Sequence, residues 1–391
     1  MTDFRTLDDL NPAGKRVLVR LDLNLPLQNG KVTDMTRLER SLPTLKELAS
    51  KGAKVIVMAH LGRPVGTDKT LTLAPIALAL KEALVPLPVH FCEGPQVLKG
   101  IEALGPGEIL LLENIRFVPG EEKNDPAFAQ EMAQWGDVYV NDAFSTAHRA
   151  HASTEGIAHL LPSYAGRLME EELHALHMTL DNPKRPLMAI VGGAKVSTKL
   201  PLLENLLSKV DILVMCGAMA NTFLAALGHD VGASLYEPDL ISTAKGLLDK
   251  GREILLPVDV VVAQDLKDPY PRTCMIHEVK KEDKIFDIGP ATVSHIYHKM
   301  SSSHTLLWNG PLGVFETLPF DHGTNAVAQA AAHLTREGSI VSVAGGGDTV
   351  AALAHAGVVD DFTYVSTAGG AFLEWLEGKP LPGVLALLKK R

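Results

Sequence analysis

The sequence predicts an α/β protein made of two doubly wound, Rossmann-like parallel-sheet domains joined by a helical hinge. Short apolar runs alternate with segments of helical periodicity along the 391 residues. Near-continuous apolar strands separated by helices favour parallel sheets that are covered on both faces. A charged helical segment, residues 166–186, ends in Asn-Pro and Arg-Pro, and the alternation restarts after it. The chain is long enough for two or three domains of about 150 residues.

The predicted elements are read from the spacing of the apolar residues. The helical segments carry apolar residues near i, i+3, i+4 and i+7 and are followed by glycine, as in residues 37–52 and 322–338. The predicted strands lie in residues 16–22, 54–60, 108–114 and 137–142 of the first half, and in 186–193, 211–217, 304–310, 339–346 and 362–370 of the second.

These elements divide the chain into four segments. We predict an N-terminal domain over residues 1–168, an interdomain helix and hinge over 169–186, a C-terminal domain over 187–375, and a C-terminal segment over 376–391. From the residues alone, the Pro-rich break and short amphipathic helix of the last segment could pack on either domain.

Composition narrows the class of partner. The formal net charge is −9, which argues against a general electrostatic preference for nucleic acid. The three cysteines are far apart and contain no C-x-x-C pair, as is typical of a reducing compartment. No apolar run reaches the roughly 20 residues of a membrane helix, and the first ten residues do not resemble a signal peptide. We therefore expect a cytoplasmic protein without membrane or nucleic-acid partners.

Cationic side chains follow the predicted strands of the first half. Several arginines at the same end of one sheet would repel each other unless an anion lay among them. Arginine also binds carboxylate and phosphate in a bidentate manner. The sequence therefore predicts a small polyanionic ligand. The residues at these strand ends are Asp22 and Asn24, with Arg37 just beyond them, then His60 and Arg63, then Arg116, and finally His148, Arg149 and His151.

Glycines follow the predicted strands of the second half instead. Glycine lets a backbone approach a ligand closely, and helix N-termini attract phosphate. Asp348 adds an oxygen ligand suited to Mg²⁺, with Thr349 near a helix start. Lys195 and Lys199 are four residues apart, which at a helix start would place both near one face. Together with Gly192, Gly193, Gly217, Gly310, Gly345, Gly346, Gly347, Gly369 and Gly370, these residues predict a nucleotide–Mg²⁺ site.

Two familiar nucleotide motifs are absent. The stretch VGGAKVSTK, residues 191–199, does not fit G-x-x-x-x-G-K-[ST], and no G-x-G-x-x-G opens a helix. Three histidine pairs at i, i+3 could be zinc ligands, but no cysteine or acidic partner completes a usual zinc spacing. The expected nucleotide site therefore divides its parts between residues 191–199 and residues 345–349.

Seven stretches of the chain resemble the phosphoglycerate kinase family. They occur in the family's order and cover essentially the whole chain: RVLVRLDLNLP, HLGRP, ENIRF, NDAFSTAHRAHAST, GGAKVSTK, WNGPLGVFE and GGGDT. The resemblance implies a monomeric, hinged, two-domain enzyme. Residues 1–168 would form the triose-phosphate-binding domain, residues 187–375 the nucleotide-binding domain, and residues 376–391 a segment that returns to the N-domain. It implies reversible phosphoryl transfer between 1,3-bisphosphoglycerate and ADP, giving 3-phosphoglycerate and ATP, with Mg²⁺.

The resemblance also implies roles for individual residues. The triose substrate would be held by Asp22, Asn24, Arg37, His60, Arg63, Arg116, His148 and Arg149. Lys195 and Lys199 would follow the nucleotide and the transferring phosphoryl group, and Asn309, Pro311 and Glu316 would line the nucleoside pocket. Gly345 to Thr349 would carry the phosphate-binding helix start, with Asp348 on Mg²⁺. The catalytic group would comprise Arg37, Lys195, Lys199, Gly369 and Gly370.

A few positions depart from the family's usual pattern. Leu25 stands where a small residue or valine is common, and Ala218 where a second glycine is common. In the last glycine loop, Ala368 and Phe372 replace glycine and serine. That loop lies near the expected chemistry, and we expect that these replacements do not abolish activity.

Two other functions fit parts of the pattern. One is an ATP-dependent kinase for another acyl or sugar phosphate, and the other is a hinged protein that binds nucleotide or anions without turnover. A carboxylate acceptor is already ionised at neutral pH, which agrees with the lack of an obvious general base. We expect catalysis by alignment and charge stabilisation after hinge closure.

Overall fold

The computed structural model describes residues 4–94 and 96–388. Residues 1–3, 95 and 389–391, which fall in the predicted N-terminal and C-terminal segments, lie outside the described residues. The described chain divides into two compact units. Unit 1 contains residues 4–173 and 380–388, and unit 2 contains residues 174–379. Helix α5 (Arg167–Leu176) continues from the first unit into the second.

Unit 1 contains a six-stranded parallel sheet with the order β5-β6-β4-β1-β7-β8. A small antiparallel pair, β2 and β3, lies outside it. The elements are β1 (Arg16–Leu21), β2 (Leu27–Gln28), β3 (Lys31–Val32), α1 (Thr36–Ser50), β4 (Lys54–Met58), α2 (Ala74–Ala83), β5 (Val89–Cys92), α3 (Val97–Ala103), β6 (Ile109–Leu112), α4 (Pro126–Ala133), β7 (Val138–Asp142), β8 (Ser163–Ala165) and α13 (Pro382–Leu385).

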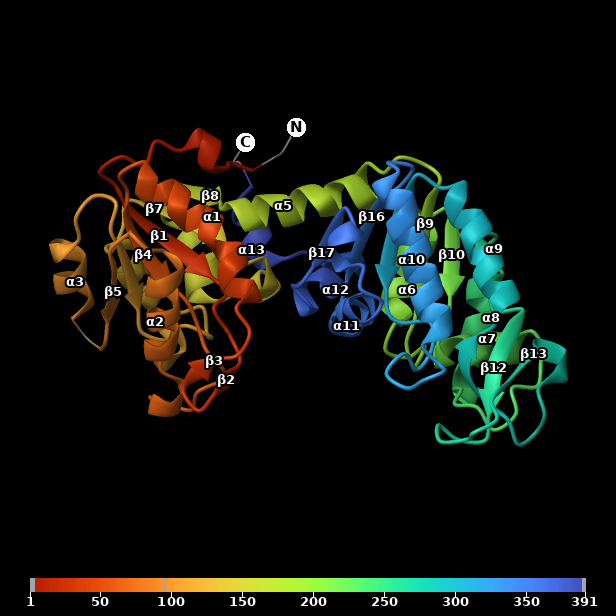
Figure 1. The fold of residues 1–391 in the computed structure, drawn as a ribbon. Coiled ribbons are helices and arrows are strands. Elements are labelled where there is room, and N and C mark those ends of the chain that lie inside the picture. The colour runs from red at the N-terminus through yellow and green to blue at the C-terminus, as the bar shows by residue number, and fades with distance from the viewer. Residues whose placement is uncertain (1–3, 95, 389–391) are drawn as a thin grey trace. The chain divides into compact units, whose positions relative to one another are not determined.

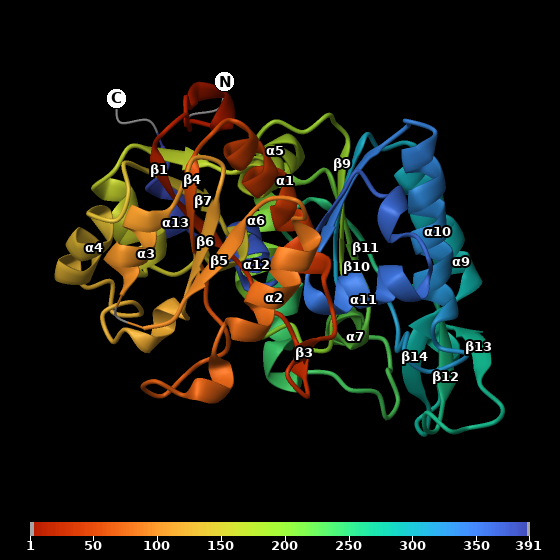
Figure 2. The ribbon, with the colours of Figure 1, turned by 60° about the vertical axis from the view of Figure 1, so that its left-hand side comes forward.

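The core of unit 1 follows the alternation of side chains along its strands. Val17 and Val19 of β1 point to the same face, together with alternate residues of β4, β6 and β7. Leu45 of α1 and Ile76 of α2 cover that face and are fully buried. In Figure 2, α1 and α2 lie on one side of these strands, and α4 lies on the other.

The C-terminal helix belongs to unit 1. Both ribbon views place α13 among the elements of this unit (Figures 1 and 2). The backbone N–H of Gly383 donates to the carbonyl oxygen of Ala147 at 2.9 Å. Leu381 and Leu387, on either side of the helix, are buried. The segment therefore covers the chain that follows β7.

Unit 2 contains a second six-stranded parallel sheet, with the order β11-β10-β9-β15-β16-β17. In Figure 2, α6 and α12 lie on one face of this sheet, and α9 and α10 lie on the other. The elements are β9 (Leu187–Val191), α6 (Leu200–Lys209), β10 (Ile212–Met215), α7 (Ala218–Ala226), α8 (Ile241–Leu248), β11 (Glu253–Leu255), α9 (Pro290–Ser301), β15 (Thr305–Asn309), α10 (His322–Arg336), β16 (Val341–Gly345), α11 (Gly347–His355), β17 (Tyr364–Ser366) and α12 (Gly370–Leu376).

The two parallel sheets confirm the predicted fold class, but unit 2 holds a further sheet that the sequence analysis did not predict. Strands β12 (Asp259–Ala263), β13 (Arg272–Met275) and β14 (Lys284–Ile288) form an antiparallel sheet beside α7 and α8 (Figure 1). Strands β13 and β14 are partly exposed and lack a continuous apolar run, whereas β12 is largely buried. Val260 and Val262 anchor a small hydrophobic cluster there.

Across the described residues, no helix combines the length and the apolar character needed to cross a membrane.

Asp259 joins the antiparallel sheet to helix α9. Its buried carboxylate accepts hydrogen bonds from the backbone N–H groups of Ala291 at 2.9 Å and Thr292 at 2.7 Å, and from the Thr292 hydroxyl at 2.7 Å. These N–H groups belong to the first turn of the helix, where no intrahelical partner is available.

We predict that Asp259→Ala lowers the free energy of unfolding by about 2 kcal/mol, because buried helix N–H groups lose their acceptor. Urea unfolding monitored by circular dichroism measures the change. The matched control is Asp249→Ala, which removes an exposed carboxylate near the end of α8. Equal stability of the two variants would contradict the capping role.

Candidate functional sites

Four neighbouring strands of unit 1 present polar side chains at their carboxyl ends. These strands are β6, β4, β1 and β7, in that order across the sheet. In parallel sheets this edge is where ligands bind. The sequence-predicted residues follow the strands as expected: Asp22 and Asn24 after β1, His60 and Arg63 after β4, Arg116 after β6, and His148 and Arg149 after β7.

Arg37 lies at the start of α1 and is held by the loop after β1. Its Nη1 donates to Asp22 Oδ2 at 2.9 Å and approaches the carbonyl oxygen of Asn24 at 3.4 Å. The Ser145 hydroxyl, from the loop after β7, donates to the same Asp22 oxygen at 2.5 Å. Asp22 thus ties the loops after two neighbouring strands to Arg37.

Asn24 and Arg116 are joined through the loop after β4. The backbone N–H of Gly62 donates to Asn24 Oδ1 at 2.9 Å, and Arg116 Nη1 donates to the Gly62 carbonyl oxygen at 2.7 Å. Gly62 has a φ of +62°, and a Cβ there would lie 2.9 Å from Leu71. A glycine is therefore required for this loop to approach both side chains.

The cluster is strongly cationic and partly buried. Burial lowers the pKa of Arg116 below its usual range. Burial, followed by the charges of Arg116 and Arg20, lowers the pKa of His151 to about 4. Arg149 Nε donates to His148 Nε2 at 3.2 Å, while Arg63 is exposed. An anion placed among these groups would relieve their mutual repulsion.

Sequence analysis missed three buried residues beneath this cluster. Arg20 and Glu121 are fully buried, and Asn114 is almost so. The amide of Asn114 donates to the carbonyl oxygens of Leu61 at 2.8 Å and Leu71 at 2.9 Å, which fixes the loop after β4. A charged residue inside the apolar run RVLVRLD was the signal that could have identified Arg20.

In unit 2, glycines hold the loops after β9, β10 and β15 against each other. A Cβ on Gly192 would lie 1.8 Å from the carbonyl oxygen of Pro311, and a Cβ on Gly217 would lie 2.6 Å from that of Gly193. Gly217 and Gly310 also have positive φ values, +70° and +99°. These glycines are required for close backbone packing, in addition to any approach to a ligand.

The predicted placement at a helix start is correct for Lys199 and wrong for Lys195. Helix α6 begins at Leu200, so Lys199 is its N-cap and Lys195 lies in the preceding turns. Pro201 near the first helical position favours a start at this point. Only Lys199 reaches the strand ends: its Nζ donates to Asn309 Oδ1 at 2.5 Å, and burial lowers its pKa.

Asn309 and Thr349 organise the loops around Lys199. Asn309 Nδ2 donates to the carbonyl oxygen of Gly345 at 2.6 Å. The Thr349 hydroxyl accepts from the N–H of Gly310 at 2.7 Å and donates to the Gly345 carbonyl oxygen at 2.9 Å. Thr349 is buried with both partners inside the protein, so it positions loops rather than presenting a free hydroxyl to a ligand.

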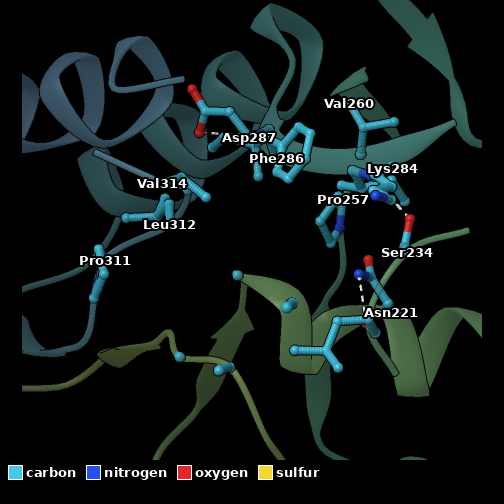
Figure 3. A pocket seen from close by; sticks show the side chains of 18 of the residues that line it. Asn221, Ser234, Pro257, Val260, Lys284, Phe286, Asp287, Pro311, Leu312 and Val314 are labelled. Carbon is cyan, nitrogen blue, oxygen red and sulfur yellow. Dashed lines mark hydrogen bonds between the residues drawn. The ribbon is translucent and has the colours of Figure 1, made fainter. Parts of the chain in front are cut away.

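A cavity of about 740 Å³ opens beside these loops. Figure 3 shows Pro311, Leu312 and Val314 on one side of it, and Asn221 and Ser234 on another. Of the residues predicted from the sequence, Gly193, Gly217, Pro311, Glu316 and Asp348 line the cavity. Its volume is in the range of small-molecule and cofactor sites.

The far wall of the cavity was not predicted. It comes from α7, the chain before α8, and the antiparallel strands β12 and β14, with Asn221, Tyr236, Val260 and Phe286 among its residues. Asp287 also lines it, and burial raises the pKa of this carboxyl to about 7. This wall depends on the unpredicted sheet, so strand-end glycines alone could not reveal it.

The remaining predicted glycines lie around other loops of unit 2. Gly346 is the N-cap of α11 with a φ of +103°, and Gly347 is its first residue. Gly369 is the N-cap of α12 with a φ of +52°, and Gly370 is its first residue. These residues are not part of the cavity lining described above.

Asp348 is the candidate metal ligand. It is exposed, lies in the first turn of α11 and lines the cavity. Within residues 4–94 and 96–388, no group of three or more His, Cys, Asp or Glu side chains could enclose a metal ion. One carboxylate in the lining of a cavity fits Mg²⁺, which commonly binds one or two carboxylates together with substrate phosphates and water.

The family model described as phosphoglycerate kinase matches residues 7–379, which include both sites. The chain belongs to the phosphoglycerate kinase family. It is 58% identical over 393 residues to the phosphoglycerate kinase of Rhodospirillum centenum, covering 98% of this chain and 99% of that protein. It is 57% identical over 400 residues to the phosphoglycerate kinase of Methylorubrum populi, with complete coverage of both.

Solved phosphoglycerate kinase structures share the fold. The enzyme from Coxiella burnetii matches with a TM-score of 0.92 and 43% identity, covering 98% of each chain. The enzyme from Pyrococcus horikoshii matches with a TM-score of 0.80 and 32% identity, also covering 98% of each chain.

Two departures from the phosphoglycerate kinase pattern have a packing explanation. Phe372 is fully buried, and a Cβ on Gly345 would lie 2.6 Å from its ring. The phenyl ring therefore fills the space beside the strand that leads into α11. Leu25 is also buried and belongs to the core of unit 1. Both side chains contribute to packing.

We predict that Gly192→Ala lowers the melting temperature by at least several degrees, because its Cβ has no room beside the Pro311 carbonyl. The matched control is Gly347→Ala, where a Cβ would meet nothing within 4 Å. Differential scanning calorimetry compares the two. A Gly192→Ala variant as stable as the control would show that the loops after β9 and β15 separate easily.

Proposed function

We propose that this chain catalyses the reversible, Mg²⁺-dependent transfer of a phosphoryl group between 1,3-bisphosphoglycerate and ADP, giving 3-phosphoglycerate and ATP. The observation that carries the proposal is the family match over residues 7–379, which spans the cationic cluster of unit 1 and the cavity of unit 2. The chemistry of each site agrees with one of the two substrates.

The cationic cluster suits the triose substrate. Asp22 orients Arg37 directly, and Asn24 holds the Gly62 loop to which Arg116 donates. The N–H donors of the cluster come from Arg37, His60, Arg63, Arg116, His148 and Arg149. A small ligand with phosphate and carboxylate groups can accept several such bonds at once. Arginine favours both groups because its planar guanidinium matches their oxygens.

The cavity of unit 2 suits the nucleotide. Its apolar wall, with Leu312, Val314 and Phe286, can enclose a base, while exposed Glu316 can accept hydrogen bonds from a ribose. Lys199 and the glycine loops lie at the strand ends, where phosphates would bind. Lys195 lies four residues before Lys199, ahead of α6. Gly369 and Gly370 begin α12 and are proposed to lie near the transferring group.

Asp348 would hold Mg²⁺ together with the nucleotide phosphates and water. When bound, the ion neutralises negative charge on the phosphates of the nucleotide. The protein itself places the Asp348 carboxylate at the start of α11. Lys199 is close enough for the Asp348 charge to act on it, because that charge opposes the lowering of the Lys199 pKa by burial.

Catalysis needs no general base, because the carboxylate of 3-phosphoglycerate is ionised at neutral pH. Arg37 and Lys199 would stabilise the charge that develops during transfer. Because the two substrates belong to different units, we propose that hinge movement within residues 169–186 brings the reacting groups together and excludes water. We also propose a monomeric, cytoplasmic enzyme, supported by family membership and by three free cysteines.

A coupled assay tests the reaction. The purified chain should consume ATP only when 3-phosphoglycerate and Mg²⁺ are both present, and omission of Mg²⁺ is the control. Turnover with other carboxylate or sugar acceptors, but not with 3-phosphoglycerate, would favour a different kinase. Ligand binding without turnover would favour a binding protein.

We predict that Arg37→Ala lowers kcat by about 100-fold or more with a smaller change in KM, because its charge acts mainly in the transition state. Steady-state kinetics for 3-phosphoglycerate measure both constants. The matched control is Lys46→Ala, which removes an exposed cation from the same helix. An increase in KM with unchanged kcat would limit Arg37 to ground-state binding.

A further inference from the structure

Arg20 carries a positive charge into the interior of unit 1. It lies next to the carboxyl end of β1 and has no exposed surface. Buried arginines are rare unless every donor is satisfied. All parts of this guanidinium have partners: Nε donates to the Ser153 hydroxyl at 2.9 Å, Nη1 donates to the carbonyl oxygen of Leu21, and Nη2 contacts His60 Nδ1 at 3.0 Å.

Glu121 provides the compensating charge through Ser153. The Ser153 hydroxyl donates to Glu121 Oε1 at 2.6 Å, and its backbone N–H donates to Oε2 at 2.9 Å. Burial raises the pKa of Glu121, and the Arg20 charge opposes that rise. The guanidinium is thus held by Ser153 on one side, with its Nη2 directed at the ring of His60.

The contact with His60 has only one possible polarity. A guanidinium is always charged under these conditions and has five N–H donors but no acceptor. His60 Nδ1 must therefore be the acceptor, so it carries no proton. We propose that Arg20 is a positioning residue that fixes His60 as the neutral tautomer protonated at Nε2.

The alternative states of His60 are disfavoured by the same geometry. A proton on Nδ1, in either the other tautomer or the imidazolium, would point at an Arg20 N–H. The charged or titratable groups that face His60 are Arg20, Arg116, His151 and Arg37, and all of them oppose a further positive charge. Burial and these neighbours hold the pKa of His60 far below its usual range.

The fixed tautomer determines what His60 offers to a ligand. Among the described residues, His60 Nε2 has no hydrogen-bond partner, and this atom is not fully buried. It therefore presents a single N–H donor toward solvent at the cationic edge of the sheet. This step rests on the proposed function: the acceptor would be an oxygen of the triose substrate. His60 would recognise it by a hydrogen bond whose strength does not depend on pH between about 5 and 8.

Histidine tautomers can be observed directly. We would label the full chain with ¹⁵N-histidine, record long-range ¹H–¹⁵N spectra from pH 5 to pH 8, and assign His60 by its absence in His60→Gln. The expected result is one protonated nitrogen, Nε2, throughout this range. A proton on Nδ1, or a titration within the range, would overturn the proposal. Neither observation requires the enzyme to turn over.

Variants separate the positioning role from general stability. Arg20→Lys, which keeps a donor-only side chain, should retain the Nε2 tautomer where it reaches the ring. Arg20→Met should yield a mixture of tautomers and raise KM for 3-phosphoglycerate about tenfold, the cost of losing one well-placed hydrogen bond to an anion. If Arg20→Met does not fold, the wild-type spectra still test the tautomer, because a proton on Nδ1 would overturn the proposal.

Ser153→Ala is the matched control within the same buried network. It removes the bridge to Glu121 and should lower the melting temperature, but it leaves the Arg20 contact with His60 and hence the tautomer. A tautomer shift in Ser153→Ala as large as that in Arg20→Met would assign the effect to general loosening and overturn the proposal. A fixed tautomer in a chain that does not act on 3-phosphoglycerate would support the positioning role and refute the proposed reaction.

Discussion

Parallel strand pairing is the constraint on which both sites depend. A strand can pair in parallel with its neighbour only if the chain crosses back over the sheet, so every strand ends at the same edge. In unit 1 that edge collects cations from β6, β4, β1 and β7, and in unit 2 it collects glycines from β10, β9, β15 and β16. The residues of each site are distant in sequence, but the sheet order makes them neighbours.

The two edges solve different physical problems. In unit 1, burial, together with neighbouring cations, lowers the pKa of Arg116 and His151. Hydrogen bonds hold two of the arginines in place: Arg37 donates to Asp22, and Arg116 donates to the carbonyl oxygen of Gly62, whose N–H donates to Asn24. In unit 2, the glycine loops contact one another through their backbones, and Lys199 is the cation they enclose. One edge therefore supplies a cluster of cations, and the other lies beside a cavity lined by residues such as Glu316 and Asp348.

The sequence predicted the features that depend on apolar periodicity and on the residues at strand ends. The apolar runs located the parallel strands, and the polar residues after them located Asp22, Arg37, Gly217 and Asp348. The antiparallel sheet was not predicted, because β13 and β14 are partly exposed and lack a continuous apolar run, and the cavity wall around Phe286 was therefore not predicted either. Lys195 was misplaced because spacing alone does not tell where a helix begins. Arg20 and Glu121 were not predicted, because a single buried charge leaves no periodic signal in the sequence. Their hydrogen-bond partner Ser153 is brought close to Arg20 only by folding.

Unit 1 is made from two separate parts of the chain, whereas unit 2 is continuous. On the ribosome, the residues of unit 2 have all been synthesised once residue 379 has been added, but unit 1 still lacks residues 380–388 at that moment. Until they arrive, the apolar surface that Leu381 and Leu387 cover stays open to water, and the carbonyl oxygen of Ala147 lacks the Gly383 N–H. Synthesis of unit 1 therefore begins first and is completed last. Its uncovered apolar surface makes unit 1 the part most exposed to non-native association during synthesis.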